Sequence, residues 1–193
     1  MVFYYFEGFA QYMKKENEAA LQTFKKGVAQ IKPDSDPNIV SDFYAVMGDI
    51  LHEKGLEKQA FEAYDSCLHW RPDNLSALNN YAYYLSLTKS DLKKAELMSY
   101  KTIKKEPTNS TFLDTYAWIL FLQGRYEEAN TYIEQAIKND STPSGTLFEH
   151  AGDIYYQAGK PEAALEAWQK ALQLGNNSAT LRKKINLKKY IPE

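Results

Sequence analysis

Small residues recur along this chain at a nearly constant interval, and this periodicity restricts the fold more than any other feature. One set comprises Gly8, Gly48, Ala82, Ala117 and Gly152, and a second follows twelve or thirteen residues later at Ala20, Ala60, Ala95, Ala129 and Ala164. A third lies seven residues further on at Gly27, Cys67, Thr102, Ala136 and Ala171. Successive units are 34 or 35 residues apart, except for 40 between the first two. A period of this length predicts stacked repeats of one small structural unit.

The spacing of the small residues has a physical cause. Two antiparallel helices joined by a short turn approach closely only where the facing side chains are small. A bulky residue usually stands three positions before the third set, where it fills the wedge beside the contact. These bulky residues are Phe24, Tyr64, Ile133 and Trp168, and Ser99 is the exception. The pattern therefore predicts a series of antiparallel helix pairs.

Glycines, prolines and capping residues mark the expected helix ends. Gly55, Gly124 and Gly159 fall where the first helix of a pair reverses, and a left-handed residue at that point favours glycine. Asn74 and Asn109 are predicted to be N-caps. In the last pair, Thr146 and Glu149 are predicted to form a capping box. Prolines close three of the second helices, at Pro33, Pro72 and Pro107.

These columns resemble the tetratricopeptide repeat, a unit of 34 residues with small, alanine and aromatic residues at fixed positions. Residues 41–74 match its pattern throughout. The resemblance implies an all-α, right-handed superhelical solenoid of five antiparallel helix pairs plus a C-terminal capping helix. It also implies a single domain over residues 1–193, with repeats at about 1–40, 41–74, 75–109, 110–144 and 145–177 and the capping helix at 178–193.

The C-terminal segment carries the basic run RKKINLKK. Its apolar residues, Leu181, Ile185 and Leu187, are expected to cover the final helix pair, while its basic residues face water. Repeats three to five also resemble the C-terminal block of larger bacterial repeat proteins, some of which are attached to the cell envelope. Localisation therefore stays open between the cytoplasm and, for a fragment of a longer exported protein, the cell envelope.

Composition and motifs argue against several classes of function. With 23 Lys and Arg against 25 Asp and Glu, the chain lacks the basic field that attracts nucleic acid or an anionic membrane. No apolar run is long enough for membrane insertion. His52, His69 and His150 fall in different repeats without a second ligand at metal-binding spacing. Because phosphate-binding loops, nucleophile elbows and paired carboxylates are also missing, we expect no enzymatic activity, no metal and no cofactor.

The resemblance assigns a binding surface to the first helix of each pair. In this family these helices line a concave groove, and the positions that point into it place eleven residues of this chain there. They are Asp49, Asn79, Asn80, Tyr83, Asp114, Trp118, Phe121, Glu149, His150, Asp153 and Tyr156. Because the set holds acids and aromatics but no Lys or Arg, we expect a neutral to basic protein or peptide partner. The aromatic residues have an equal alternative, which is packing between neighbouring helices.

Two functions follow from this surface. The first is a non-catalytic protein-interaction scaffold that binds a partner peptide or helix in the groove. The alternative is a structural or self-associating segment of a longer solenoid. The first helix bears on this choice, because its residues Val2, Phe3, Phe6 and Met13 belong to an apolar run too extensive to be buried by one partner helix. Exposed apolar surface of this extent predicts an interface, either with preceding repeats or in a homodimer.

Overall fold

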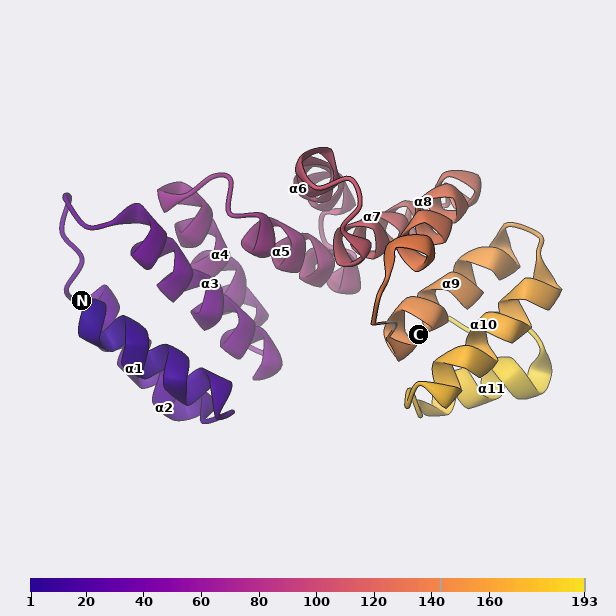
Figure 1. The fold of residues 1–193 in the computed structure, drawn as a ribbon, viewed down its shortest axis with the longest axis horizontal. Coiled ribbons are helices and arrows are strands. Elements are labelled where there is room, and N and C mark those ends of the chain that lie inside the picture. The colour runs from indigo at the N-terminus through magenta and orange to yellow at the C-terminus, as the bar shows by residue number, and fades with distance from the viewer. Residues whose placement is uncertain (143, 193) are drawn as a thin grey trace. The chain divides into compact units, whose positions relative to one another are not determined.

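The structure, a computed structural model, describes residues 1–142 and 144–192, so Pro143 and Glu193 lie outside the described residues. Within this range the regular structure is helical and contains no strand, which confirms the all-α prediction (Figure 1). No described helix is both long and apolar enough to cross a membrane. The helices are α1 (Val2–Met13), α2 (Asn17–Val28), α3 (Pro37–Glu53), α4 (Glu57–Trp70), α5 (Leu75–Thr88), α6 (Leu92–Lys105), α7 (Ser110–Leu122), α8 (Tyr126–Asn139), α9 (Gly145–Gln157), α10 (Pro161–Gln173) and α11 (Ala179–Leu187).

The chain divides into two compact units, Met1–Tyr84 and Leu85–Glu193. The first unit contains two complete helix pairs, α1 with α2 and α3 with α4, together with most of α5. The second contains the end of α5, then α6, the pairs α7 with α8 and α9 with α10, and α11. Whether residues 1–193 form a single solenoid domain with the expected repeat boundaries stays a prediction.

Glycine and aromatic residues fit together where the helices of a pair approach. A methyl group added at Gly8 would lie 2.5 Å from the Phe24 ring, and one at Gly48 would lie 2.8 Å from the Tyr64 ring. A methyl group at Gly152 would lie closer still to the Trp168 ring. In the pair α7 and α8, the corresponding residues are Ala117 and Ile133, both fully buried. In these four pairs the small residue is glycine beside the three aromatic rings and alanine beside Ile133, because the summed volume must fit one gap.

Most of the predicted helix ends are correct. Gly55, Gly124 and Gly159 have φ values of 71°, 77° and 76°, which glycine adopts without strain. The side chain of Asn74 accepts a hydrogen bond from the Ala77 amide, and that of Asn109 from the Phe112 amide.

The capping box predicted for the last pair is wrong. The N-cap of α9 is Ser144, whose hydroxyl accepts a hydrogen bond from the Leu147 amide at 3.1 Å. Thr146 therefore lies inside the helix. Glu149 is free to make contacts elsewhere, and it does so with the C-terminal segment.

Helix α11 packs as an additional layer on the last pair. Leu181 is fully buried against a cluster that includes Trp168 and Ala171, as its apolar spacing predicts. Lys184 differs from the expectation, because it is only 1% exposed and does not face water. The two carboxylates that surround it explain this burial and belong to the predicted binding surface.

Candidate protein-binding surface

Within each unit, side chains of successive first helices contact one another, and we call the surface of these helices the first-helix surface. In the first unit it consists of α1, α3 and α5 up to Tyr84, and in the second of α7, α9 and α11. The surface of the first unit contains a pocket of about 250 Å³. Its walls include Phe9, Asp42, Asp49, Arg71, Ser76 and Asn80.

Asp49 and Asn80, both predicted from the sequence, meet in this pocket. The Asn80 amide donates a hydrogen bond to Asp49 Oδ1 at 3.0 Å, which joins α5 to α3. The Tyr64 hydroxyl from α4 donates to the same carboxylate oxygen. Burial raises the pKa of Asp49 above its ordinary value, although both hydrogen bonds oppose the shift. The carboxylate is therefore held in a fixed position by its own neighbours.

The pocket also contains residues that the predicted set missed. The Tyr5 hydroxyl donates to Asp42 Oδ2 at 3.1 Å, and Arg71 lies 3.8 Å from Asp42 Oδ1. Arg71 directly follows a second helix, α4, as its C-cap, so a rule that considers only first helices cannot find it. A signal was present, because Arg71 directly precedes Pro72, where the chain turns back toward the next first helix.

Two further predicted residues of α5 differ in accessibility. Asn79 is only 4% exposed, and its side-chain oxygen has no hydrogen-bond donor within the described residues. Tyr83 is half-buried beside Tyr84, with ring centroids 5.9 Å apart. Tyr83 is accordingly better placed than Asn79 to contact a partner.

In the second unit, the predicted residues of α7 and α9 contact one another. His150 Nδ1 lies 2.9 Å from Asp114 Oδ1. The Trp118 ring stacks on both His150 and Phe121, with centroid distances of 4.2 and 4.9 Å. Phe121 is 5% exposed, so in this unit the helix-packing alternative holds for it. Trp118 Nε1 is buried without an acceptor in the part of the chain that the structure describes.

Lys184 of α11 lies between the two acids of α9. Its ammonium group donates to Glu149 Oε1 at 2.9 Å and to Asp153 Oδ2 at 2.7 Å. Asp153 also accepts a hydrogen bond from Trp168 Nε1 at 2.9 Å. Burial raises the pKa of Asp153 to about 6, against the opposing effect of Lys184. One cation is therefore shared by two acids, which offsets part of their negative charge within the chain.

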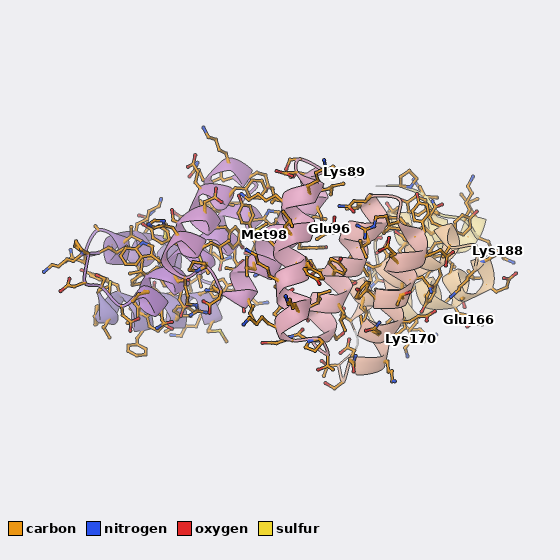
Figure 2. The ribbon with its side chains drawn as sticks, turned by 90° about the horizontal axis from the view of Figure 1, so that it is seen from above. Lys89, Glu96, Met98, Glu166, Lys170 and Lys188 are labelled. Atoms are coloured by element: carbon orange, nitrogen blue, oxygen red, sulfur yellow. The ribbon has the colours of Figure 1, made fainter. Side chains whose placement is uncertain are left out.

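The second unit has its own pocket on this surface, of about 160 Å³. Trp118, Leu122, Asp153 and Tyr190 line it, together with residues at the end of α5 and with Lys89, which follows that helix and is labelled in Figure 2. The remaining predicted residue, Tyr156, is half-buried and stacks on the Trp168 ring with centroids 5.9 Å apart. This pocket offers aromatic and apolar contacts in place of the expected free acids.

The contact between His150 and Asp114 predicts a dependence of stability on pH. Burial lowers the pKa of His150, but the negative charges of Asp114, Asp153 and Glu149 together raise it above its ordinary value. Lys184 also contacts Asp153 and Glu149. Because the folded-state pKa is the higher one, the stabilisation is complete below the unfolded pKa of about 6.5 and is lost as the pH rises through the folded value.

We therefore expect His150→Gln to cost more free energy of unfolding at pH 6 than at pH 8. Urea unfolding of both proteins across this range measures the difference. Asp114→Asn should also weaken the pH dependence of stability, because it removes the carboxylate that contacts His150. A cost of His150→Gln that is equal at all pH values would contradict the role of this contact.

Within the described residues, no group of three or more His, Cys, Asp and Glu side chains is arranged to hold a metal ion. Cys67 is buried, and burial raises the pKa of its thiol to about 11. Its sulfur lies 3.1 Å from the Ser41 hydroxyl, which also accepts from the Asn74 amide. The thiol thus belongs to a buried polar contact, as its place in the column of small residues predicts.

The stacked antiparallel pairs and their regular columns define a helical-repeat protein. Two models of the tetratricopeptide repeat family match the chain, over residues 117–179 and 41–74. The chain belongs to the tetratricopeptide repeat family. Proteins of this family are generally scaffolds that bind protein partners, and their fold is typically not that of an enzyme.

Several known proteins are similar to the chain. The type IV pilus assembly protein PilF of Pseudomonas aeruginosa is 26% identical over 152 residues, which make up 78% of this chain and 60% of PilF. The TPR repeat-containing protein MJ1428 of Methanocaldococcus jannaschii is 26% identical over 185 residues, or 89% of this chain and 30% of that protein. A solved structure of Pseudomonas aeruginosa PilF matches with a TM-score of 0.73 at 18% identity, covering 96% of this chain and 86% of that one. This last likeness shows the fold.

Proposed function

We propose that the chain is a non-catalytic scaffold that binds a segment of a partner protein on its first-helix surface. The observation that carries this proposal is the pocket of the first unit. Three successive first helices contribute hydrogen-bonding groups to it: Tyr5 and Asp42 from α1 and α3, and Asn80 from α5. A pocket lined by polar groups from several repeats fits a ligand that runs across the repeats.

The polar side chains of this pocket are held before any partner arrives. Asn80 is bonded to Asp49, and Asp42 is contacted by both Tyr5 and Arg71. Side chains that are already ordered lose little conformational entropy on binding, which favours affinity. Ser76, by contrast, is exposed at the pocket and open to a partner.

The expected preference for a neutral to basic partner is better supported in the first unit than in the second. Asp42 and Asp49 line the pocket of the first unit, and Arg71 is the cation in its described lining. In the second unit, Lys184 offsets Glu149 and Asp153. We infer that the first unit supplies most of the charge selectivity and that Trp118 and Tyr190 supply apolar contacts in the second.

Site-specific photo-crosslinking tests the proposal. A photoreactive phenylalanine placed at Ser76 should capture a partner protein in extracts of the source organism, because this position opens into the pocket. Ser76→Trp should fill the pocket and weaken binding of the captured partner to the purified chain by at least roughly tenfold, or about 1.4 kcal/mol. Titration of the labelled partner measures the affinity.

Gln59 of α4 provides the matched control, because it is exposed and does not line the pocket. The same probe at Gln59 should not capture the partner, and Gln59→Trp should leave the affinity unchanged. Equal effects at both positions would place the binding surface elsewhere. If the protein captured at Ser76 is a second copy of this chain, the alternative of a self-associating segment replaces the scaffold.

A further inference from the structure

The exposed apolar residues of α1 form a stripe that continues the pocket of the first unit. Val2, Phe6, Phe9 and Met13 are spaced by four, three and four residues, so they share one face of the helix. Val2, Phe6 and Met13 are 51%, 67% and 78% exposed. Phe9 is half-buried and lines the pocket itself. We call these four residues the apolar stripe.

A row of acids occupies the corresponding positions of α3. Asp42, Asp49 and Glu53 have the spacing of one helix face, and we call them the acidic row. The apolar stripe and the acidic row run next to each other. At one end, Tyr5 of α1 donates a hydrogen bond to Asp42. Further along the two helices, Phe9 of the apolar stripe and Asp49 of the acidic row line the same pocket.

The acidic row keeps a negative charge in the folded chain. Arg71 lies 3.8 Å from Asp42 and offsets that carboxylate. Asp49 accepts hydrogen bonds from the neutral groups of Tyr64 and Asn80. Glu53 is exposed and accepts from the Asn17 amide, which is also neutral. A partner that covers the apolar stripe is therefore also attracted if it carries cations along one edge.

We propose that the first unit binds an amphipathic helix whose apolar face is bordered by Lys or Arg. The inference rests on the proposed function, because it concerns the same first-helix surface. The apolar stripe extends over three turns of α1, roughly 16 Å, and has the spacing of a ridge that another helix can pack against. The apolar stripe has no hydrogen-bonding side chain, so it offers apolar anchors at helical spacing, which is how an amphipathic helix is recognised.

Other occupants fit these charges less well. An anionic membrane surface would be repelled by the acidic row. A second copy that packed through its own α1 would bring its own acidic row and Glu7 to the interface, against Lys14 and Lys15 at the end of that helix. A basic amphipathic helix satisfies both the apolar stripe and the acidic row.

Two synthetic helical peptides of about 18 residues, long enough to span the stripe, test the inference. Both carry the same leucine face, bordered by lysine in one and by glutamate in the other. Fluorescence anisotropy with the full chain should show that the lysine peptide binds at least tenfold more tightly. Phe6→Ser should weaken its binding roughly tenfold through the loss of an apolar anchor. Glu53→Lys should reduce or reverse the preference between the two peptides.

Matched controls come from the same unit. Phe3→Ser removes a 71% exposed aromatic from another face of α1, and Glu62→Lys reverses an exposed charge on α4. Both variants should bind the lysine peptide like the wild type. Equal binding of the two peptides, or an equal loss in Phe3→Ser and Phe6→Ser, would overturn the inference.

Light scattering tests the remaining alternative, in which a second copy of the chain covers the apolar stripe. A wild-type dimer that Phe6→Ser converts to a monomer would assign the apolar stripe to a second copy and overturn the inference. The proposed function has a separate criterion, the capture of a partner from Ser76. Capture from Ser76 without a preference for the lysine peptide would contradict the amphipathic helix alone. Failure of capture combined with a clear peptide preference would contradict the wider scaffold proposal instead.

Discussion

Replacing Lys184 with methionine is expected to lower the free energy of unfolding of the second unit by roughly 3–5 kcal/mol at pH 7. Lys184 is 1% exposed, and it contacts Glu149 and Asp153, which are 8% and 2% exposed. Methionine has a similar length, so apolar packing is largely kept while the charge is removed. Two buried carboxylates then remain without their cation, and this desolvation cost is the source of the predicted loss. Urea unfolding followed by circular dichroism measures it.

Lys183, the preceding residue of α11, is exposed and provides the control. Lys183→Met should change stability by less than about 0.5 kcal/mol.

The pH dependence provides a second criterion. The folded-state pKa of Asp153 is raised to about 6, above its unfolded value of about 3.8, and removal of Lys184 should raise it further. Folded protein therefore takes up a proton more readily than unfolded protein, and the cost of Lys184→Met should shrink as the pH falls from 7 to 5. Equal costs for the two variants would show that the buried ion pair contributes nothing specific.

The periodicity of small residues predicted the helix pairs correctly because it reflects a constraint on the backbone. Helices of a pair can approach at Gly48 only if no side chain stands in the way, and Tyr64 then fills the space beside it. This constraint acts within about twenty residues and leaves a direct mark on residue size. The turn glycines are predictable for the same reason, since Gly55 needs a φ of 71° that other residues adopt at a cost.

The candidate surface was harder to predict, because its charges are set by contacts between successive repeats. Asp114 and Glu149 occupy equivalent positions 35 residues apart, and each contacts a basic residue of the following first helix. For Asp114 this residue is His150, and for Glu149 it is Lys184, which stands 34 residues after His150. Continuing the period past the last repeat would have placed Lys184 among the acids. The basic run around Lys184 suggested a solvated face instead and concealed this signal.

The second large effect is expected at Gly152, where Gly152→Ala should destabilise the second unit by about 3 kcal/mol. Two effects oppose each other at this position. Alanine in a helix interior is favoured over glycine by about 1 kcal/mol, because glycine loses more backbone entropy on folding. A methyl group at Gly152, however, would come closer to the Trp168 ring than side-chain atoms approach each other in proteins. Trp168 is fully buried, and its Nε1 is bonded to Asp153 at 2.9 Å, so the ring cannot move aside without losing that bond. The steric cost should therefore exceed the gain in helix propensity.

The pair formed by Ala117 and Ile133 in α7 and α8 indicates how to isolate this contact. In a chain that already carries Trp168→Ile, the pair α9 and α10 has an isoleucine at the position that Ile133 occupies in α7 and α8. The methyl group of Gly152→Ala then has room. Gly152→Ala should then be neutral or stabilising by up to about 1 kcal/mol, so that its effect changes sign between the two backgrounds. Chemical unfolding of the wild type, both single variants and the double variant gives the coupling energy. If Gly152→Ala were destabilising by the same amount with tryptophan and with isoleucine, the close approach to Trp168 would not be what requires glycine at this position.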